Sequence, residues 1–166
     1  MRWSERGLSL LEVTAGLSLT AIVTIVAVPV LKRELRASHQ AEARDTLLRM
    51  GEAATAFARV PKHRHGLPDA IARTPAEVPR GTSVVLEAPA WAAWAPLMAE
   101  VVPAGFSQRY AYSFVRPAGE PAAFEAVAES DLDGDGVLGR ASLRGTVDAS
   151  GNVTLAPDVE FVDALE

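Results

Sequence analysis

The sequence predicts an α+β protein in which a long N-terminal helix precedes a small antiparallel β-sheet. Three observations support this fold class. Residues 8–31 are almost wholly apolar or small, residues 32–60 repeat apolar side chains at steps of three and four, and the period changes to two after residue 108. These changes divide the chain into a short polar leader at 1–7, a helix at 8–60 and a β-rich head at 61–166.

The apolar stretch at 8–31 is long enough to cross a membrane. At about 1.5 Å per residue, a helix of this length spans the roughly 30 Å hydrocarbon core of a bilayer. A secretory signal peptide has a shorter apolar region followed by a small-residue cleavage site, and no such site precedes the charged stretch that starts at Lys32. We therefore expect a transmembrane segment. Lys and Arg residues flank it on both sides, so charge alone does not set its orientation.

The second half of the predicted helix, at 32–60, is amphipathic. Leu47, Met50, Ala54 and Phe57 recur at three- and four-residue steps and share one face. A continuous helix over 8–60 would be about 80 Å long, with its first half in lipid and its second half packed on the head. Pro29 removes one backbone hydrogen bond and is expected to kink this helix.

The head is predicted to begin with a proline-rich loop at 61–89 that contains a short strand at 83–87. A short helix follows at 90–101, with Trp91, Trp94 and Leu97 or Met98 on one face. Alternating apolar positions predict strands at 109–115, 122–128, 141–147, 152–155 and 159–162, with a turn at 148–151. The strands are expected to form an antiparallel sheet that packs on the amphipathic helix.

Charge is distributed unevenly along the 166 residues. The net charge of −5 divides into +2 through Val60 and −7 from Pro61 onward. An acidic head argues against a nucleic-acid surface, which needs a positive field to neutralise phosphates, and we expect no nucleic-acid partner. The sequence has no cysteine, so disulfides and thiolate metal sites are excluded and the loops of the head need another fastening.

Glu12 is the one ionisable residue between Leu8 and Leu31. An ionisable group inside a membrane segment is energetically costly and is a candidate functional residue by default. It must be protonated, meet a cation or lie near the membrane surface. The simpler alternative is that Glu12, only four residues into the segment, reaches the lipid headgroups.

The residues around Glu12, Gly7-Leu-Ser-Leu-Leu-Glu-Val13, resemble the type IV prepilin motif. The resemblance covers roughly the first 35 residues and includes the short leader with Arg2 and Arg6, the spacing of the carboxylate and the position of Pro29. Leu8 departs from the family, which more often has phenylalanine there. The resemblance implies a pilin-like fold, cleavage by a prepilin peptidase between Gly7 and Leu8, and N-methylation of Leu8.

The same resemblance implies a role for Glu12 in assembly. Its carboxylate would pair with the new amino terminus of a neighbouring subunit, because an unpaired charge in an apolar bundle costs far more than a matched pair. The implied partners are the prepilin peptidase, other pilin subunits and an inner-membrane assembly platform. The implied location is the inner (cytoplasmic) membrane as a single-pass protein, and then a pilus or pseudopilus filament in the periplasm or at the cell surface.

An acidic loop at 131–136, Asp-Leu-Asp-Gly-Asp-Gly, is the second chemical signal. Asp131, Asp133 and Asp135 alternate as oxygen ligands for a hard cation do, and the backbone carbonyl of Val137 would be the next ligand. The glutamate that closes an EF-hand would fall at Ser142, so this is not an EF-hand. We expect a structural calcium ion, which the resemblance supports because some pilins and pseudopilins carry calcium loops. Its remaining ligands are left among Glu125, Glu129, Asp148 and water, and the alternative is a solvated acidic turn.

No catalytic constellation is evident, so we expect a protein that is not an enzyme. His63 and His65 have the spacing of a metal pair, but a solvated loop explains them better. Three functions follow: a major or minor pilin, a type II secretion pseudopilin, or a membrane-anchored calcium-binding adaptor or sensor that keeps residues 1–7. The tyrosine-containing strand before the acidic loop is similar to that in pilins of gliding deltaproteobacteria, which favours the pilus over the pseudopilus.

Overall fold

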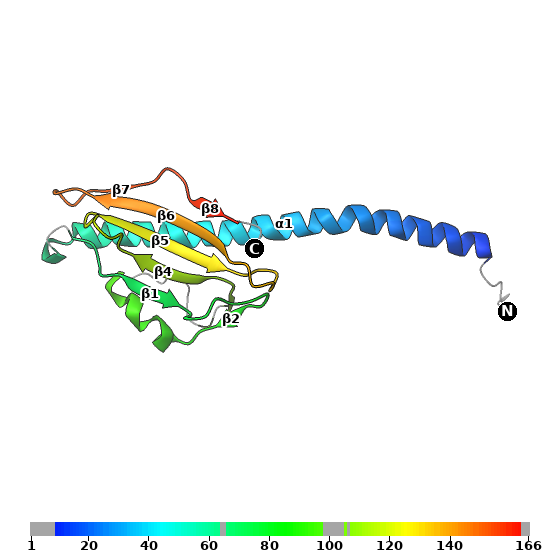
Figure 1. The fold of residues 1–166 in the computed structure, drawn as a ribbon, viewed down its shortest axis with the longest axis horizontal. Coiled ribbons are helices and arrows are strands. Elements are labelled where there is room, and N and C mark those ends of the chain that lie inside the picture. The colour runs from blue at the N-terminus through cyan, green and yellow to red at the C-terminus, as the bar shows by residue number, and fades with distance from the viewer. Residues whose placement is uncertain (1–8, 64–65, 98–104, 106, 164–166) are drawn as a thin grey trace, which may run out of the picture. The chain divides into compact units, whose positions relative to one another are not determined.

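The structure is α+β, with an apolar N-terminal helix and an antiparallel sheet (Figure 1). The computed structural model describes residues 9–63, 66–97, 105 and 107–163. It divides into two compact units, an N-terminal unit of residues 1–39 and a C-terminal unit of residues 40–166. The predicted leader at 1–7 lies outside the described residues.

Helix α1 runs from Leu10 to Arg59, close to the predicted helix at 8–60. It has no glycine or proline in its last eight residues, and it ends where Pro61 starts a short 3₁₀ turn, η1 (Pro61–His63). The His63 ring stacks on Phe57 at 3.6 Å between ring centroids, and its Nδ1 lies 2.9 Å from the Phe57 carbonyl oxygen. This contact closes the C-terminal end of the helix, where carbonyl groups lack intrahelical partners.

Within the C-terminal unit, α1 buries one face. Five apolar residues on this face, at steps of three and four, are fully buried: Ala43, Leu47, Met50, Ala54 and Ala58. Leu47, Met50 and Ala54 were predicted on this face, whereas Phe57 is only half-buried because Ala58 takes the next inward position. Gly51 allows a close approach, since a Cβ there would lie 3.0 Å from the Leu143 side chain.

The described strands form one six-stranded antiparallel sheet and one two-stranded sheet. The large sheet contains β1 (Ile71–Thr74), β4 (Ala111–Val115), β5 (Ala123–Ser130), β6 (Gly139–Val147), β7 (Val153–Leu155) and β8 (Glu160–Val162), in the order β1-β4-β5-β6-β7. Strand β8 also pairs with β6. Strand β5 pairs along almost the whole of one edge of β6. The other edge of β6 is therefore shared by β7 and β8.

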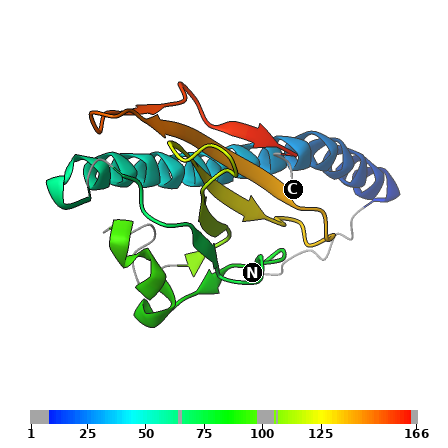
Figure 2. The ribbon, with the colours of Figure 1, turned by 60° about the vertical axis from the view of Figure 1, so that its left-hand side comes forward.

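The core lies between α1 and one face of the large sheet (Figures 1 and 2). Tyr110, Tyr112 and Phe114 alternate inward, as predicted, and burial raises the pKa of Tyr110 to about 12. Phe114 stacks on Phe124 of β5 at 5.1 Å between ring centroids. Phe124 and Val127 lie on opposite faces of β5, also as predicted, and both are buried.

Two parts of the head differ from the sequence prediction. Strand β1 lies inside the predicted loop at 61–89; it has only four residues between Pro68 and Pro75, and an edge strand tolerates such neighbours. The predicted helix at 90–101 is a 3₁₀ helix, η2 (Ala88–Leu97), with Pro96 inside it. Trp94 and Leu97 are buried and Trp91 is partly buried, while Met98 lies outside the described residues.

The remaining strand predictions are confirmed to within a few residues. The short strand predicted at 83–87 is β2 (Val84–Val85), which pairs with β3 (Ser107–Gln108). The turn predicted at 148–151 joins β6 to β7, and Gly151 there has φ of 82°. The last predicted edge strand corresponds to β8.

Candidate functional site

The first part of α1, Leu10–Leu31, is an uncovered apolar surface. It has 22 residues with a mean hydropathy of 2.1, and none of it is buried in the described structure. Large side chains such as Leu10, Leu17 and Ile25 are 81%, 66% and 72% exposed. This helix is long and apolar enough to cross a membrane, as the sequence predicts.

Four hydroxyl groups within this apolar segment bond to its own backbone. Ser18, Thr20 and Thr24 each donate to the carbonyl four residues earlier at 2.8 Å, and Thr14 donates to the Leu11 carbonyl at 3.0 Å. Such bonds satisfy the hydroxyl donors without water. Because their hydrogen bonds are already made, these hydroxyl residues carry little desolvation cost in a medium that offers no hydrogen bonds.

Glu12 lies in the first turn of α1 and is held by Ser9. The Ser9 backbone N–H and hydroxyl donate to Glu12 Oε2 at 2.8 and 2.9 Å, and the Glu12 N–H donates to Ser9 Oγ at 3.3 Å. This reciprocal arrangement is a capping box, which satisfies backbone N–H groups at the start of a helix. The spacing Ser-x-x-Glu before an apolar run is its sequence signature, so local spacing alone could have predicted this cap.

Of the other residues predicted to act in processing and assembly, only Pro29 lies among the described residues. Pro29 lies inside α1, and the helix continues through it; the kink expected there stays a prediction. Gly7 and Leu8, between which cleavage was predicted, lie outside the described residues.

The acidic loop connects β5 to β6. Strands lie on both sides of it, which agrees with the expectation that this is not an EF-hand. Asp131 is fully buried, whereas Asp133 and Asp135 are exposed. One carboxylate oxygen from each aspartate lies within 4.8 Å of the others, so the sequence correctly predicted that these three side chains come together.

Backbone N–H groups within the loop fix the three carboxylates. Asp131 accepts from the Gly134 N–H at 2.7 Å and from the Gly136 N–H at 3.1 Å, one on each carboxylate oxygen. Asp133 accepts from the Asp135 N–H at 3.2 Å, and Asp135 accepts from the Val137 N–H at 2.7 Å. The carboxylates are therefore oriented by the backbone before any ligand arrives.

The loop is also attached to the segment before β2. The Asp131 carbonyl accepts from the Gly81 N–H at 2.7 Å, next to a parallel bridge between Arg80 and Asp131. Gly81 and Gly134 have φ of 59° and 81°, and a Cβ on Gly81 would lie 3.5 Å from the Gly134 Cα. Two glycines thus permit both the left-handed turns and the close backbone approach.

The donor set fits a hard cation such as calcium. Three carboxylate oxygens converge, and oxygen-only ligands at this spacing suit Ca²⁺, which takes six to eight of them. Carbonyl oxygens, including that of Val137, and water would have to complete the shell.

The further protein ligands considered from sequence are engaged elsewhere. Glu125 pairs with Arg140 and Glu129 pairs with Arg73, each at 3.0 Å. Asp148 follows the far end of β6 and accepts hydrogen bonds from Ser150 and Asn152. The structure brings none of the three into the aspartate cluster.

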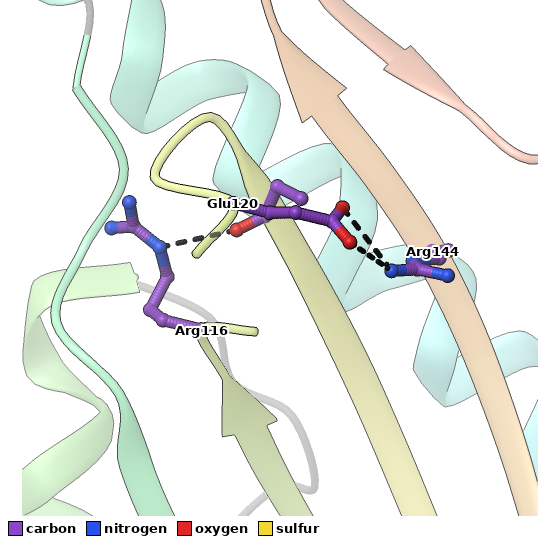
Figure 3. Close-up of polar contacts among 4 residues, drawn as sticks. Arg116, Glu120 and Arg144 are labelled. Carbon is purple, nitrogen blue, oxygen red and sulfur yellow. Dashed lines mark hydrogen bonds and ion pairs between the residues drawn. The ribbon is translucent and has the colours of Figure 1, made fainter. Parts of the chain in front are cut away.

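A different group holds the opposite end of the sheet, and no local sequence pattern indicates it. Arg116, after β4, donates to the carbonyls of Ala123 at 3.2 Å, Leu67 at 3.4 Å and Pro68 at 3.2 Å, and also to that of Pro121. Figure 3 shows two separate contacts in this region. Arg116 donates to a backbone carbonyl, and the Glu120 carboxylate accepts two hydrogen bonds from Arg144 of β6. In a chain without cysteine, Arg116 joins the connection after α1 to the β4–β5 connection.

The structure does not describe a metal site at His63 and His65. His63 stacks on Phe57 at the end of α1, and His65 lies outside the described residues. The described residues gather only the three aspartates of the acidic loop as a possible metal cluster.

Two features of the described chain are suited to partners outside it. The apolar surface of Leu10–Leu31 suits an apolar environment, and Glu12, held by Ser9, lies at its start. The aspartate cluster offers oxygen ligands to a cation. Comparisons with models of protein families, with curated proteins and with solved structures give no match for this chain.

Proposed function

We propose that this chain is a pilin-like structural subunit of a type IV pilus-like filament. A prepilin peptidase would cut between Gly7 and Leu8 and the new amino terminus would be methylated. The subunit would wait in the inner membrane as a single-pass protein and then enter the filament through its apolar helix. The observation that carries the proposal is Glu12 at the start of an uncovered apolar helix.

An uncovered apolar helix explains both stages of such a life cycle. In the membrane, lipid tails cover the side chains of Leu10–Leu31. In a filament, the same side chains pack against helices of other subunits, and backbone hydrogen bonds remain satisfied within each helix. One surface therefore serves as an anchor first and as an assembly contact afterwards.

Glu12 supplies the specificity that apolar packing lacks. Apolar helices slide past one another with little change in energy, whereas a buried carboxylate must meet a positive charge. Cleavage before Leu8 creates an amino group at the start of every mature subunit. Pairing between Glu12 and that amine of a neighbour would set the axial position of each incoming subunit.

The proposal is tested first by Glu12→Ala. We expect the variant to insert into the membrane and to be cleaved normally, because its apolar helix is unchanged. Its incorporation into filaments should fall at least tenfold, measured as subunit in the sheared filament fraction against subunit in the membrane. Normal incorporation would exclude the pairing role.

Mass spectrometry of the amino terminus tests the processing step separately. We expect a mature chain that starts at methylated Leu8. An intact Met1 would exclude the filament proposal and favour a membrane-anchored adaptor or sensor that binds calcium. A pseudopilin of type II secretion shares the leader and the helix, and it is distinguished by loss of secretion rather than twitching when the chain is deleted.

We further propose that the acidic loop binds calcium as a structural ion. Asp131 is buried and its orientation is fixed by two N–H groups, which suits a permanent ligand better than a sensor that must open. Binding would stabilise the folded chain by about 2.7 kcal/mol at a calcium concentration a hundred times the dissociation constant.

Thermal melting of the full chain in detergent tests the calcium proposal. Millimolar calcium should raise the melting temperature by several degrees, and the same concentration of magnesium should raise it less. The double variant Asp133→Asn, Asp135→Asn changes only exposed members of the loop and should lose the calcium effect. An equal rise in the variant would show that calcium acts elsewhere.

A further inference from the structure

We propose that Ser9 is the positioning residue for Glu12, a role that rests on the proposed filament function. Ser9 contributes two donors, its backbone N–H and its hydroxyl, and both bonds end on the same carboxylate oxygen, Oε2, at 2.8 and 2.9 Å. The geometry thus fixes the direction of the carboxylate and leaves Oε1 outside both bonds for a positively charged partner.

The two bonds also change what Glu12 costs in the membrane. A carboxylate in an apolar medium without partners carries the full penalty of lost hydration. Ser9 replaces part of that hydration with two hydrogen bonds from the same chain. The two bonds also hold Oε2 against Ser9, so a neighbour's amine would meet an Oε1 atom whose direction is already fixed.

Ser9 survives the predicted processing. A cut between Gly7 and Leu8 leaves Ser9 as the second residue of the mature chain, directly beside the new amino group in sequence. The Ser9 N–H remains an ordinary peptide donor after the cut. The same bonds to Glu12 are thus available before and after cleavage.

A serine at this position has a second effect, because it also caps the helix. The Glu12 N–H donates to Ser9 Oγ at 3.3 Å, which helps to start α1. The experiment must therefore separate the capping of the helix from the positioning of the carboxylate. Glycine keeps most of the N-cap preference, within a few tenths of a kcal/mol, but has no hydroxyl. Threonine keeps both.

The test compares Ser9→Gly with Ser9→Thr in the full chain, expressed with the assembly system. Ser9→Gly should be inserted and cleaved as in the wild type, while its incorporation into filaments falls about threefold to tenfold. Ser9→Thr should restore incorporation to within about twofold of the wild type. Wild-type incorporation of Ser9→Gly, or failure of Ser9→Thr to restore it, would overturn the inference.

Glu12→Ala in the same assay distinguishes this inference from the function on which it rests. If Glu12→Ala is defective and Ser9→Gly is normal, Glu12 acts in assembly without help from Ser9, and only the positioning role fails. If Glu12→Ala incorporates normally, the pairing role fails as well.

Discussion

The two units of this chain use the same kinds of side chain in opposite ways. In the N-terminal unit the described leucines, isoleucines and valines of α1 are 40–81% exposed. In the C-terminal unit Leu47 and Met50 of the same helix are fully buried against the sheet. A single helix thus carries one surface completed by its own chain and another that the described chain leaves open.

The difference shows that hydropathy and burial carry separate information. Large apolar residues on all sides of a helix, as in Leu10–Leu31, indicate a helix surrounded by an apolar medium or by other helices. Apolar residues on one face, as from Ala43 to Ala58, indicate a helix that meets one partner surface. Stability of the fold should therefore depend on the second set, and assembly on the first.

The largest expected effect comes from Phe124→Ala. Phe124 is fully buried, stacks on Phe114 and lies so close to Gly145 that a Cβ there would be 2.4 Å from its ring. Removing the ring leaves a cavity, and we expect the free energy of unfolding to fall by about 3–5 kcal/mol. Chemical denaturation of the full chain in detergent, followed by tryptophan fluorescence, measures this loss.

Leu19→Ala is the matched control in the N-terminal unit. Leu19 is 65% exposed, so its truncation should change the free energy of unfolding by less than about 0.5 kcal/mol. Both variants truncate a large apolar side chain to alanine, one at a buried position and one at an exposed position. A large loss with Leu19→Ala would show that the open surface is part of the folded core, and the comparison between the units would not stand.

A smaller effect is expected from Arg116→Ala, which tests how the C-terminal unit holds its loops without disulfides. The guanidinium group donates to four backbone carbonyls, three in two connections and one on the first residue of β5. Its loss leaves carbonyls without these donors, and we expect destabilisation of about 2 kcal/mol. Arg116→Lys should recover only part of it, because an ammonium group lacks the planar set of five donors.

Arg144→Ala is the corresponding control on the surface. Arg144 pairs with Glu120 at 3.1 Å, but both side chains are more than half exposed. An exposed ion pair contributes about 0–1 kcal/mol. Equal losses for Arg116→Ala and Arg144→Ala would mean that Arg116 acts as an ordinary surface charge rather than as a fastening.

The sequence predicted the fold class and the long helix because periodicity reports burial directly. Leu47, Met50 and Ala54 recur at helical steps, and Tyr110, Tyr112 and Phe114 alternate, so helix and strand follow from one pattern each. The aspartate cluster was also predictable, since its three ligands are neighbours in the chain. Local spacing was sufficient in each of these cases.

What the sequence did not predict depends on contacts between distant segments. Strand β1 is four residues long and exists because β4 pairs with it, so its own sequence carries little signal. Arg116 reaches Leu67, which is 49 residues away, and no spacing rule indicates such a contact. Asp148 was considered as a calcium ligand because it is acidic, but β6 separates it from the loop at 131–136.

The smallest expected effect concerns Asp148, an acidic residue that, like Glu12, accepts backbone N–H groups. Hydrogen bonds from Asn152, through its backbone and its side chain, hold the pKa of Asp148 below its ordinary value, with a further bond from Ser150. The folded state therefore favours the ionised form. Its contribution to stability is present above the unfolded pKa of about 3.9 and is lost as pH falls through and below that value.

Asp148→Asn should consequently flatten the acid limb of the stability profile without changing assembly. The denaturation midpoint of the wild type should fall as the pH drops through and below about 3.9, and that of the variant should fall less, with exposed Glu52→Gln as a surface control. Filament incorporation at neutral pH should stay at the wild-type level, because the hydrogen-bond partners of Asp148 lie within the C-terminal unit itself. A loss of incorporation with an unchanged acid limb would place Asp148 at an assembly contact. The C-terminal unit would then contribute to assembly through the β6–β7 turn, in addition to the apolar helix of the N-terminal unit.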